Sequence, residues 1–369
     1  MAIDILPRRC LRGVTPYSPG KSIASVQREL GLKYVVKLAS NENPLGPSPR
    51  AMSVYRRAEK QCALYPEGAS PQLRQAVARF HKLNADCVVV GNGSDELIRL
   101  LCEAFIEPDD DVVVSQYGFI RFRQQAALMG GRVLEIPMVD WTHDLQTMAM
   151  AASARTKIIF VANPNNPTGT YNSEEEVRRL LDAAPSSCLV VLDEAYCQFA
   201  AQWDDYPKSV PGLLKEYDNL VVLRTFSKVY GLAGLRVGYG LANPEILSWL
   251  DRIRMPFNVN LPAQQACTEA LRDAAFVRRS VALALSGREN LSVSLRELGF
   301  AVQDGATNFL FARSPIPGRE LFKALLKRGV IIRPLDEYGL SEHVRISVGN
   351  RAENRTLLGA LKQVLGVAV

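Results

Sequence analysis

Short apolar runs alternate with amphipathic stretches through most of this chain, and that alternation limits the folds open to it. The runs have the length and β-branched content of buried strands, and they cover residues 88–90, 110–116, 132–138, 156–162, 188–192 and 218–225. Helical patterns follow several of them, at 94–106, 120–129 and 173–181. Strands that alternate with helices predict an α/β fold with a mostly parallel central sheet flanked by helices.

The composition narrows the function classes. The 369 residues are 47% hydrophobic and 22% charged, which is typical of a globular protein with one large and one smaller domain. The net charge of +6 comes from scattered basic residues, so we expect neither a nucleic-acid-binding nor a membrane-binding surface. The three histidines are isolated in the sequence, which argues against a His-based metal site.

Cysteine usage and the N-terminus indicate the compartment. Seven cysteines without a CxxC pair are typical of reduced thiols. The first residues, MAIDILPRRC, lack the apolar core of a signal peptide, and no run of about 18 apolar residues occurs. We therefore expect a cytoplasmic protein.

Two segments that we expect to cross between domains divide the chain. A stretch rich in proline, asparagine and glycine ends near residue 49, and a second crossing lies around 252–271. Short strand patterns then alternate with helical ones to the C-terminus. We expect a small α+β domain made from both termini, with the segments divided as follows: 1–45 as N-terminal arm and part of the small domain, 46–265 as the large domain, and 266–369 as the rest of the small domain.

The stretch RTFSKVYGLAGLRVG, residues 224–238, carries the strongest chemical signal. Lys228 falls in the loop after a buried strand, where open α/β sheets place ligands. A lysine there can lose its proton and attack a carbonyl to form a Schiff base. Thr225 and Ser227 supply hydroxyls, and Arg236 supplies a planar fork that suits a phosphate. The stretch suits a phosphorylated aldehyde cofactor. An isolated Ser-Lys pair more often belongs to a surface loop with a solvated lysine, and the polar groups upstream reverse that preference.

A second signal is GNGSDE at 91–96, between a strand and an amphipathic helix. The free N–H groups of a helix N-terminus hold anions, and Gly93 lets the backbone approach one. The motif lacks the third glycine of dinucleotide binders, so phosphate is the better prediction. Ser94 and Asp95 also fit ordinary helix N-caps, and that alternative stays open.

Polar groups follow two further strands. Asp193 ends a buried strand and needs a partner, for which the protonated nitrogen of a pyridine ring is suited. Tyr196, three residues later, is placed to donate to the ring's phenolic oxygen. The same carboxylate also resembles a Mg²⁺-binding Walker B residue, but the chain has no GxxxxGK[ST] loop. Asn166 lies in NPNNPTG, where two Asn-Pro steps fix the loop and aim its amide.

Other candidates are ambiguous by themselves. Tyr117 lies at a strand end, where an aromatic ring can stack on a flat cofactor or pack in the core. Tyr17, Asn43 and Tyr65 fit turn chemistry as well as ligand binding. Arg333 and Arg345 lie in strand patterns of the last third, and each fits an exposed edge position as well as anion binding.

Together, NPNNPTG, LDEAY and TFSKVYGLAGLRVG resemble the fold type I pyridoxal-phosphate aminotransferases, nearly end to end. Within that group, four further motifs resemble motifs of the histidinol-phosphate aminotransferase family: TPYSPG at 15–20, LASNENPLGPSP at 38–49, LYPEG at 64–68 and GNGSDELI at 91–98. The resemblance implies a ping-pong reaction that interconverts L-histidinol phosphate and 2-oxoglutarate with imidazole acetol phosphate and glutamate. It leaves open an aromatic amino acid aminotransferase, a decarboxylase on the same scaffold, and a ligand-sensing domain of a transcription regulator.

The resemblance also implies residue roles. Lys228 would hold pyridoxal phosphate, Asp193 would pair with its pyridine nitrogen, and Asn166 and Tyr196 would contact its phenolic oxygen. Tyr117 would stack on the ring. The phosphate would be bound by Gly93, Ser94, Asp95, Thr225, Ser227 and Arg236, and by Tyr65 from the other subunit of a homodimer. Substrates would contact Tyr17, Asn43, Arg333 and Arg345.

Overall fold

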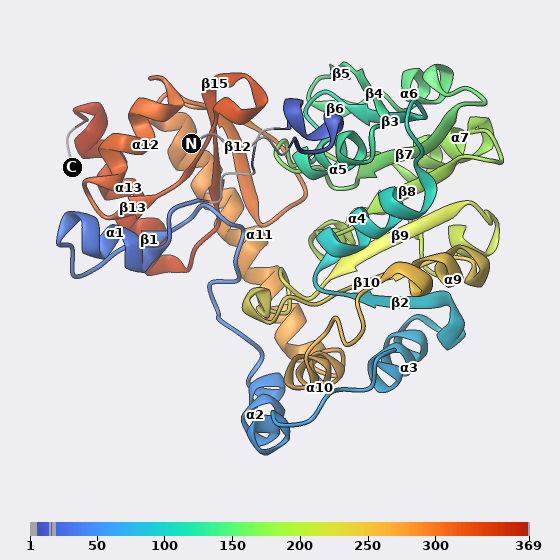
Figure 1. Cartoon of the computed structure of the whole chain (residues 1–369). Helices are drawn as coiled ribbons and strands as arrows, with labels where there is room; N and C mark the ends of the chain where they lie inside the picture. Colours follow the sequence, from blue (N-terminus) through green and yellow to red (C-terminus); the bar gives the residue numbers. More distant parts are fainter. Residues whose placement is uncertain (1–5, 15, 17–19, 368–369) are drawn as a thin grey trace.

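A seven-stranded sheet forms the centre of the larger part of the molecule (Figure 1). The computed structural model describes residues 6–14, 16 and 20–367. The strand order is β2 (Val88–Gly91), β10 (Gly238–Leu241), β9 (Leu220–Thr225), β8 (Leu189–Asp193), β7 (Thr156–Ala162), β3 (Asp111–Ser115) and β4 (Arg132–Ile136). All neighbours are parallel except β10, which is antiparallel to both β2 and β9. The predicted α/β fold with a mostly parallel sheet is confirmed.

Helices cover both faces of this sheet because alternate strand residues point to opposite sides. On one face, residues such as Val190 and Leu192 form a core with helices α3 (Pro71–His81), α6 (Leu145–Ala151), α7 (Glu174–Ala183) and α10 (Leu261–Ala270). On the other, Leu189 and Val191 pack with α4 (Ser94–Phe105), α5 (Ile120–Met129) and α9 (Pro244–Ile253). The two cores hold the carboxyl ends of the parallel strands in fixed register.

The predicted strands omit β10, which is short and contains two glycines. Gly238 lies so close to the start of α4 that a Cβ there would come within 2.4 Å of the backbone nitrogen of Ser94. A glycine is required by this close approach, and it lowers the strand signal in the sequence. The same packing brings α4 beside the loop that carries Lys228.

The smaller part combines both ends of the chain. Its antiparallel sheet has the order β11 (Ala301–Gln303), β12 (Phe309–Arg313), β15 (Leu340–Ser347) and β14 (Arg333–Leu335). β1 (Val36–Lys37) pairs in parallel with β13 (Val330–Ile331), so residues from the N-terminal segment share a core with α12 (Gly318–Leu326) and α13 (Arg351–Leu365). α1 (Ile23–Leu30) packs on the same segment through Val26.

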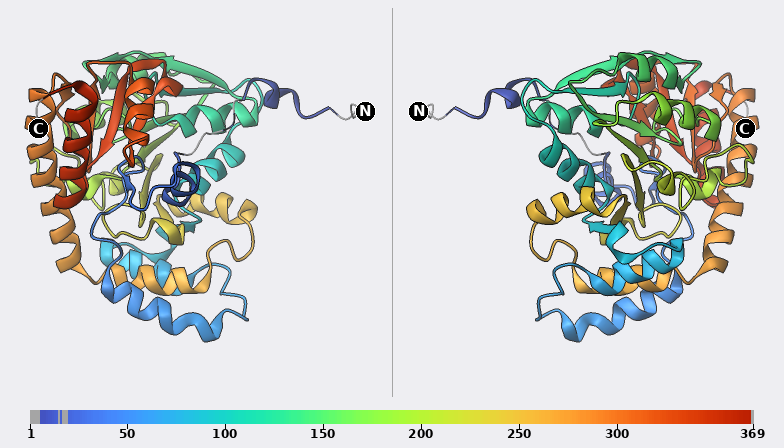
Figure 2. Two further views of the ribbon diagram at one scale, coloured as in Figure 1. Left: turned by 90° about the vertical axis from the view of Figure 1, so that its left-hand side faces the viewer. Right: turned by 90° about the vertical axis from the view of Figure 1, so that its right-hand side faces the viewer.

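The long helix α11 (Ala274–Glu297) joins the two parts. Ala284 packs in the core of the large part, while Leu291 and Leu295 pack in the core of the small part. Figure 2 shows α11 along one side of the molecule, reaching from α10 to the small part. The predicted domain boundary at 265/266 stays a prediction, since the helix belongs to both cores.

The remaining elements are short. They are α2 (Pro49–Arg57), α8 (Cys197–Ala200), the hairpin of β5 (Met138–Val139) and β6 (Thr142–His143), and the 3-10 helices Arg9–Gly13, Ala58–Gln61, Ala85–Cys87, Leu213–Lys215, Ala233–Leu235 and Asp336–Tyr338. Across the described ranges, no helix is both long and apolar enough to cross a membrane.

Candidate active site

A cavity of about 670 Å³ lies between the large sheet and the small part. One wall comes from the loops at the carboxyl ends of β7, β8 and β9, and the other from residues 37–42, β14 and β15. The cavity brings together these predicted residues: Ser94, Asp95, Asn166, Asp193, Tyr196, Thr225, Ser227, Lys228, Arg236, Arg333 and Arg345. Parallel strands end at one edge of a sheet, so side chains that are distant in sequence meet there.

Lys228 provides the amine of this cavity. It follows β9 by three residues, and its Nζ donates to the backbone oxygen of Ser40 at 3.3 Å. The same nitrogen lies 5.5 Å from the ring centroid of Tyr196. The Tyr196 hydroxyl in turn accepts from Nδ2 of Asn41 at 2.8 Å. The amine and the phenol thus converge from adjacent strands, with the N-terminal segment above them.

Asp193 is the last residue of β8, and only 5% of it is exposed. Its Oδ1 accepts from the backbone N–H of Ala195 at 3.1 Å. Burial raises the pKa of this carboxyl to about 7, opposed by the Ala195 N–H and by the charge of Lys228. A buried carboxylate gains from a hydrogen-bonded cation, and a protonated ring nitrogen fits this position.

This burial predicts a pH effect on the cofactor-free protein. The folded pKa of about 7 exceeds the value of 3.8 that we take for the unfolded chain. The stability contributed by the protonated form is therefore lost as pH rises toward 7, at about 1.4 kcal/mol per pH unit in that window. Relative to Asp193→Asn, the wild-type free energy of unfolding should fall between pH 5 and 7 and level off above it. Urea unfolding at each pH measures this, and equal slopes for the two proteins would contradict it.

An anion cradle lies at the far end of the cavity from the small part. The Thr225 hydroxyl donates to Ser227 Oγ at 3.0 Å, and Arg236 Nη1 reaches the same oxygen at 3.4 Å. Gly93, with φ +80°, precedes α4, and a Cβ there would come within 2.6 Å of Arg236 Nη2. The glycine thus makes room for the guanidinium beside the helix N-terminus at Ser94. Hydroxyls, a guanidinium and helix N–H groups are the donors that a phosphate prefers.

Asp95, a predicted phosphate contact, is paired with an arginine. Its carboxylate accepts from Arg121 at 2.7 and 3.2 Å, in a bidentate pair. Arg121 neutralises a negative charge that would otherwise repel an anion at the start of α4. Sequence reasoning did not include Arg121, because the pair joins two helices that no motif connects.

Arg345 dominates the opposite end. It lies on β15, only 9% of it is exposed, and its Nη2 donates to the backbone oxygen of Ala39 at 2.6 Å. Its Nη1 donates to Oδ1 of Asn166, which links the small part to the loop after β7. Its buried Nε has no hydrogen-bond partner among the described residues. A buried donor without an acceptor is costly, so an anionic ligand would be stabilised here.

Arg333 also lines the cavity, but it is already paired. Its Nη2 donates to both carboxylate oxygens of Glu337 at 2.6 and 2.7 Å. The two arginines therefore differ: Arg345 meets only neutral acceptors in the contacts described above, whereas Arg333 carries a carboxylate counter-ion.

Two predicted residues have a different environment from the one expected. The amide of Asn43 donates to the Val229 oxygen and to Ser280 Oγ, both at 2.8 Å, so it ties the crossing to the large part and does not line the cavity. The ring of Tyr117 packs against Trp141, with centroids 5.5 Å apart, in an apolar cluster. Phe119 lines the cavity instead. The substrate role of Asn43 and the ring-stacking role of Tyr117 stay predictions.

The last two predicted residues are Tyr65 and Tyr17. Tyr65 is 84% exposed and stacks on Phe257 with centroids 4.8 Å apart, away from this chain's cavity. Tyr17 lies outside the described residues. Sequence reasoning also missed Asn41, Lys37 and Glu42, all of which line the cavity.

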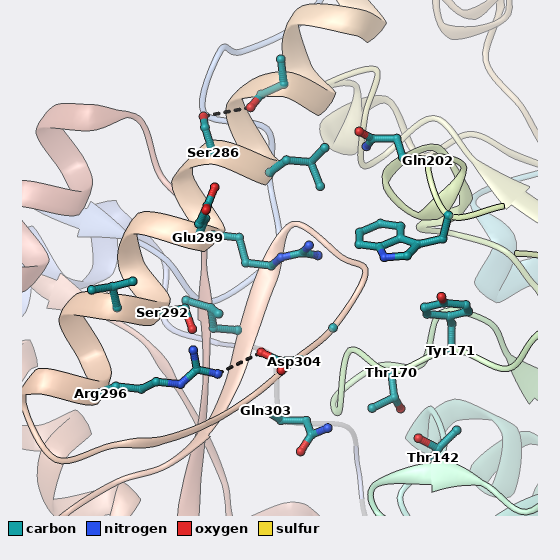
Figure 3. Close-up of a pocket in the computed structure, with 17 residues that line it drawn as sticks. Thr142, Thr170, Tyr171, Gln202, Ser286, Glu289, Ser292, Arg296, Gln303 and Asp304 are labelled. Atoms are coloured by element: carbon teal, nitrogen blue, oxygen red, sulfur yellow. Dashed lines mark hydrogen bonds and ion pairs between the residues drawn. The ribbon is translucent and has the colours of Figure 1, made fainter. Parts of the chain in front are cut away.

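A second, larger cavity of about 1060 Å³ lies between α11 and the large part (Figure 3). Thr170 and Tyr171 form one wall, and Glu289 and Arg296 project from α11 on the other. Arg296 is ion-paired with Asp304 at 2.9 Å. None of the predicted site residues that the structure describes lines this cavity.

The comparisons with known proteins agree with this geometry. The sequence model described as "Aminotransferase class I and II" matches residues 33–361. The chain belongs to this family. It is 45% identical to the histidinol-phosphate aminotransferase of Symbiobacterium thermophilum, over 97% of this chain and 98% of that protein. It is 47% identical to the one of Anaeromyxobacter sp., over 96% and 97%.

Solved structures extend the comparison. The histidinol-phosphate aminotransferase of Sinorhizobium meliloti, in complex with pyridoxal-5'-phosphate, has a TM-score of 0.89 and 28% identity, covering 99% of this chain and 98% of that one. An aspartate aminotransferase of Thermus thermophilus has a TM-score of 0.84 over 99% of this chain and all of that one, at 22% identity, and shows the shared fold. The resemblance drawn from sequence motifs is thus confirmed.

Proposed function

We propose that this chain is a pyridoxal-phosphate-dependent aminotransferase that interconverts L-histidinol phosphate and 2-oxoglutarate with imidazole acetol phosphate and L-glutamate. One observation carries the proposal. A single cavity holds the Lys228 amine, the buried Asp193 carboxylate and an anion cradle at one end, and an incompletely satisfied arginine at the other. The relatives with 45% and 47% identity support the choice of substrates.

The residues present fit the cofactor. Its phosphate would lie on Ser94, Thr225, Ser227 and Arg236, where donors already converge. Its ring nitrogen would supply the cation that buried Asp193 lacks. When bound, pyridoxal phosphate supplies an aldehyde that exchanges amino groups and a ring that withdraws electrons from the reacting carbon.

The side chains around the reacting carbon have separate tasks. Lys228 Nζ would attach to the aldehyde carbon and, once substrate has replaced it there, move the proton at the substrate Cα. Tyr196, held by Asn41, would hold the phenolic oxygen together with Asn166. Arg345 would bind the oxyanion of either substrate. In a ping-pong reaction the first product leaves before the second substrate binds, so the two substrates use one pocket in turn.

A spectroscopic half-reaction tests the function. The protein is loaded with pyridoxal phosphate, and its absorbance is followed as histidinol phosphate, phenylalanine or tyrosine is added at equal concentration. We expect histidinol phosphate to convert the cofactor to its amine form far faster than either aromatic acid. Faster conversion by the aromatics would replace the proposed substrate and retain the cofactor site. No conversion by any of the three would refute an aminotransferase of this specificity.

Arg345 carries a prediction of its own. Arg345→Met removes the charge but keeps much of the buried volume, and it leaves the Ala39 oxygen and Asn166 without their donor. We expect KM for histidinol phosphate and for glutamate to rise together by about 30- to 100-fold, or about 2–3 kcal/mol. Steady-state kinetics with each substrate measure this. A rise for one substrate alone would contradict a shared anion site.

We further propose that the enzyme is a cytoplasmic homodimer in which Tyr65 reaches the phosphate of the other subunit. Exposed apolar side chains support an interface near that residue: Leu64 (70%), Tyr65 (84%), Met255 (68%) and Phe257 (43%). Such a group is typical of a protein contact surface. Sedimentation equilibrium tests the assembly, and a monomer at micromolar concentration would refute it.

A further inference from the structure

Lys37 places a third cation at the end of the cavity that holds Arg333 and Arg345. It is the last residue of β1, its side chain is 18% exposed, and it lines the cavity together with Arg333 and Arg345. Its Nζ lies 2.8 Å from Oε1 of Glu42, a carboxylate whose side chain is 46% exposed. No sequence motif singled out Lys37.

The backbone fixes Lys37 close to both arginines. Lys37 lies opposite Ile331 in the parallel pair of β1 and β13, and Arg333 follows two residues later. On the same segment, the Ala39 oxygen accepts from Arg345. Lys37, Ala39, Arg333 and Arg345 all line this one cavity.

Three cations and two carboxylates lie at this end, so its net charge is positive and rises further if Glu42 turns away. Of the three cations, Lys37 is paired with Glu42 and Arg333 with Glu337, while Arg345 contacts a carbonyl and an amide. A phosphate monoester carries close to two negative charges and three acceptor oxygens, whereas a carboxylate carries one charge and two oxygens. Two guanidinium groups suffice for a carboxylate. A third oxygen calls for another donor, and an ammonium binds phosphate as a point charge.

We propose that Lys37 is a further substrate-binding residue that contacts the phosphate of the phosphorylated substrate and distinguishes it from the carboxylate substrate. Glu42 is its counter-ion while no substrate is bound, and the exposed carboxylate turns to solvent when the phosphate enters. This inference rests on the proposed function, because it assigns a group to the phosphate of that substrate.

The chain offers a matched control. Lys21 and Glu29 form another lysine–glutamate pair, with side chains 36% and 51% exposed, and neither residue lines the cavity. Lys21→Met removes the same charge from the surface near α1. Any effect of overall charge on a dianionic substrate would appear in this variant as well.

The test compares holoenzyme KM values for Lys37→Met, Glu42→Gln and Lys21→Met. We expect Lys37→Met to raise KM for histidinol phosphate about tenfold and KM for glutamate less than threefold. Glu42→Gln should lower KM for histidinol phosphate, because Lys37 no longer has to leave a carboxylate. Lys21→Met should change neither value. In the glutamate reaction, inorganic phosphate should inhibit Lys37→Met more weakly than wild type.

The outcomes separate the two proposals. If wild type transaminates histidinol phosphate but Lys37→Met leaves its KM unchanged, or raises both KM values equally, the role of Lys37 is refuted. If wild type transaminates other amino acids and not histidinol phosphate, the proposed function itself fails. If Lys37→Met does not fold, Glu42→Gln decides, and an unchanged or higher KM for histidinol phosphate overturns the proposal.

Discussion

Replacing Lys228 with alanine is expected to abolish transamination, with kcat falling by at least about 10⁴-fold. Lys228 is the lysine at the carboxyl end of β9, and its Nζ donates to the Ser40 oxygen and lies near the Tyr196 ring. Without the amine, the proton at the substrate Cα has no acceptor at that position. The same variant loses the covalent attachment of the cofactor, so the absorbance band of lysine-bound cofactor should disappear.

Stopped-flow absorbance and steady-state turnover measure the two effects separately. Lys215→Ala is a suitable control, because Lys215 is exposed in the 3-10 helix before β9 and lies outside the cavity. It should retain full activity. A Lys228→Ala protein that kept more than a small percentage of wild-type kcat would show that another group moves the proton.

Much of the cofactor end of the cavity was predictable because key residues lie at or soon after strand ends. Asp193 ends β8, and Asn166 and Lys228 lie in the loops after β7 and β9; the three strands are adjacent and parallel. A strand assignment by itself therefore places all three at one edge. The helical pattern at 173–181 also agrees with α7, where Ser173 and Glu176 form a capping box within one turn of the chain.

Local signals failed where tertiary packing decides the conformation. Pro71 begins α3, but Ser70, a residue type that favours helix N-caps, adopts φ 50° and makes no side-chain capping bond. Phe80 is 51% exposed although it lies at helical spacing from the buried Leu73 and Val77. In both cases the surroundings override a weak intrinsic preference.

The substrate end was less predictable because it is assembled from distant segments. Ala39 contacts Arg345 across 306 residues, and Asn41 reaches Tyr196 across 155. The sequence pointed to Asn43 in the Asn-rich crossing, whereas Asn41 of the same segment lines the cavity, and only the folded chain decides which partners each asparagine meets. The contact of Tyr117 with Trp141 was not predictable for the same reason, since Trp141 comes from a separate hairpin loop.

Removing the Asp193 carboxylate is expected to have the second-largest effect. The folded chain keeps this group 5% exposed, and its pKa of about 7 without cofactor reflects burial. Next to a protonated ring nitrogen the carboxyl would stay ionised and hold that proton in place. Asp193→Ala should lower kcat by about 10²- to 10³-fold, as when one preorganised electrostatic contact is lost from an active site.

Cofactor retention should suffer much less, because the phosphate cradle of Thr225, Ser227 and Arg236 is untouched. Equilibrium dialysis of pyridoxal phosphate, together with single-turnover rates, separates the two effects. Asp205→Asn removes an exposed carboxylate that accepts from Tyr171, and it should leave both quantities unchanged. If Asp193→Ala lost cofactor affinity in proportion to kcat, the carboxylate would act as an anchor alone. If the rate per bound cofactor fell instead, the electronic role of Asp193 would follow directly from its burial at the end of β8.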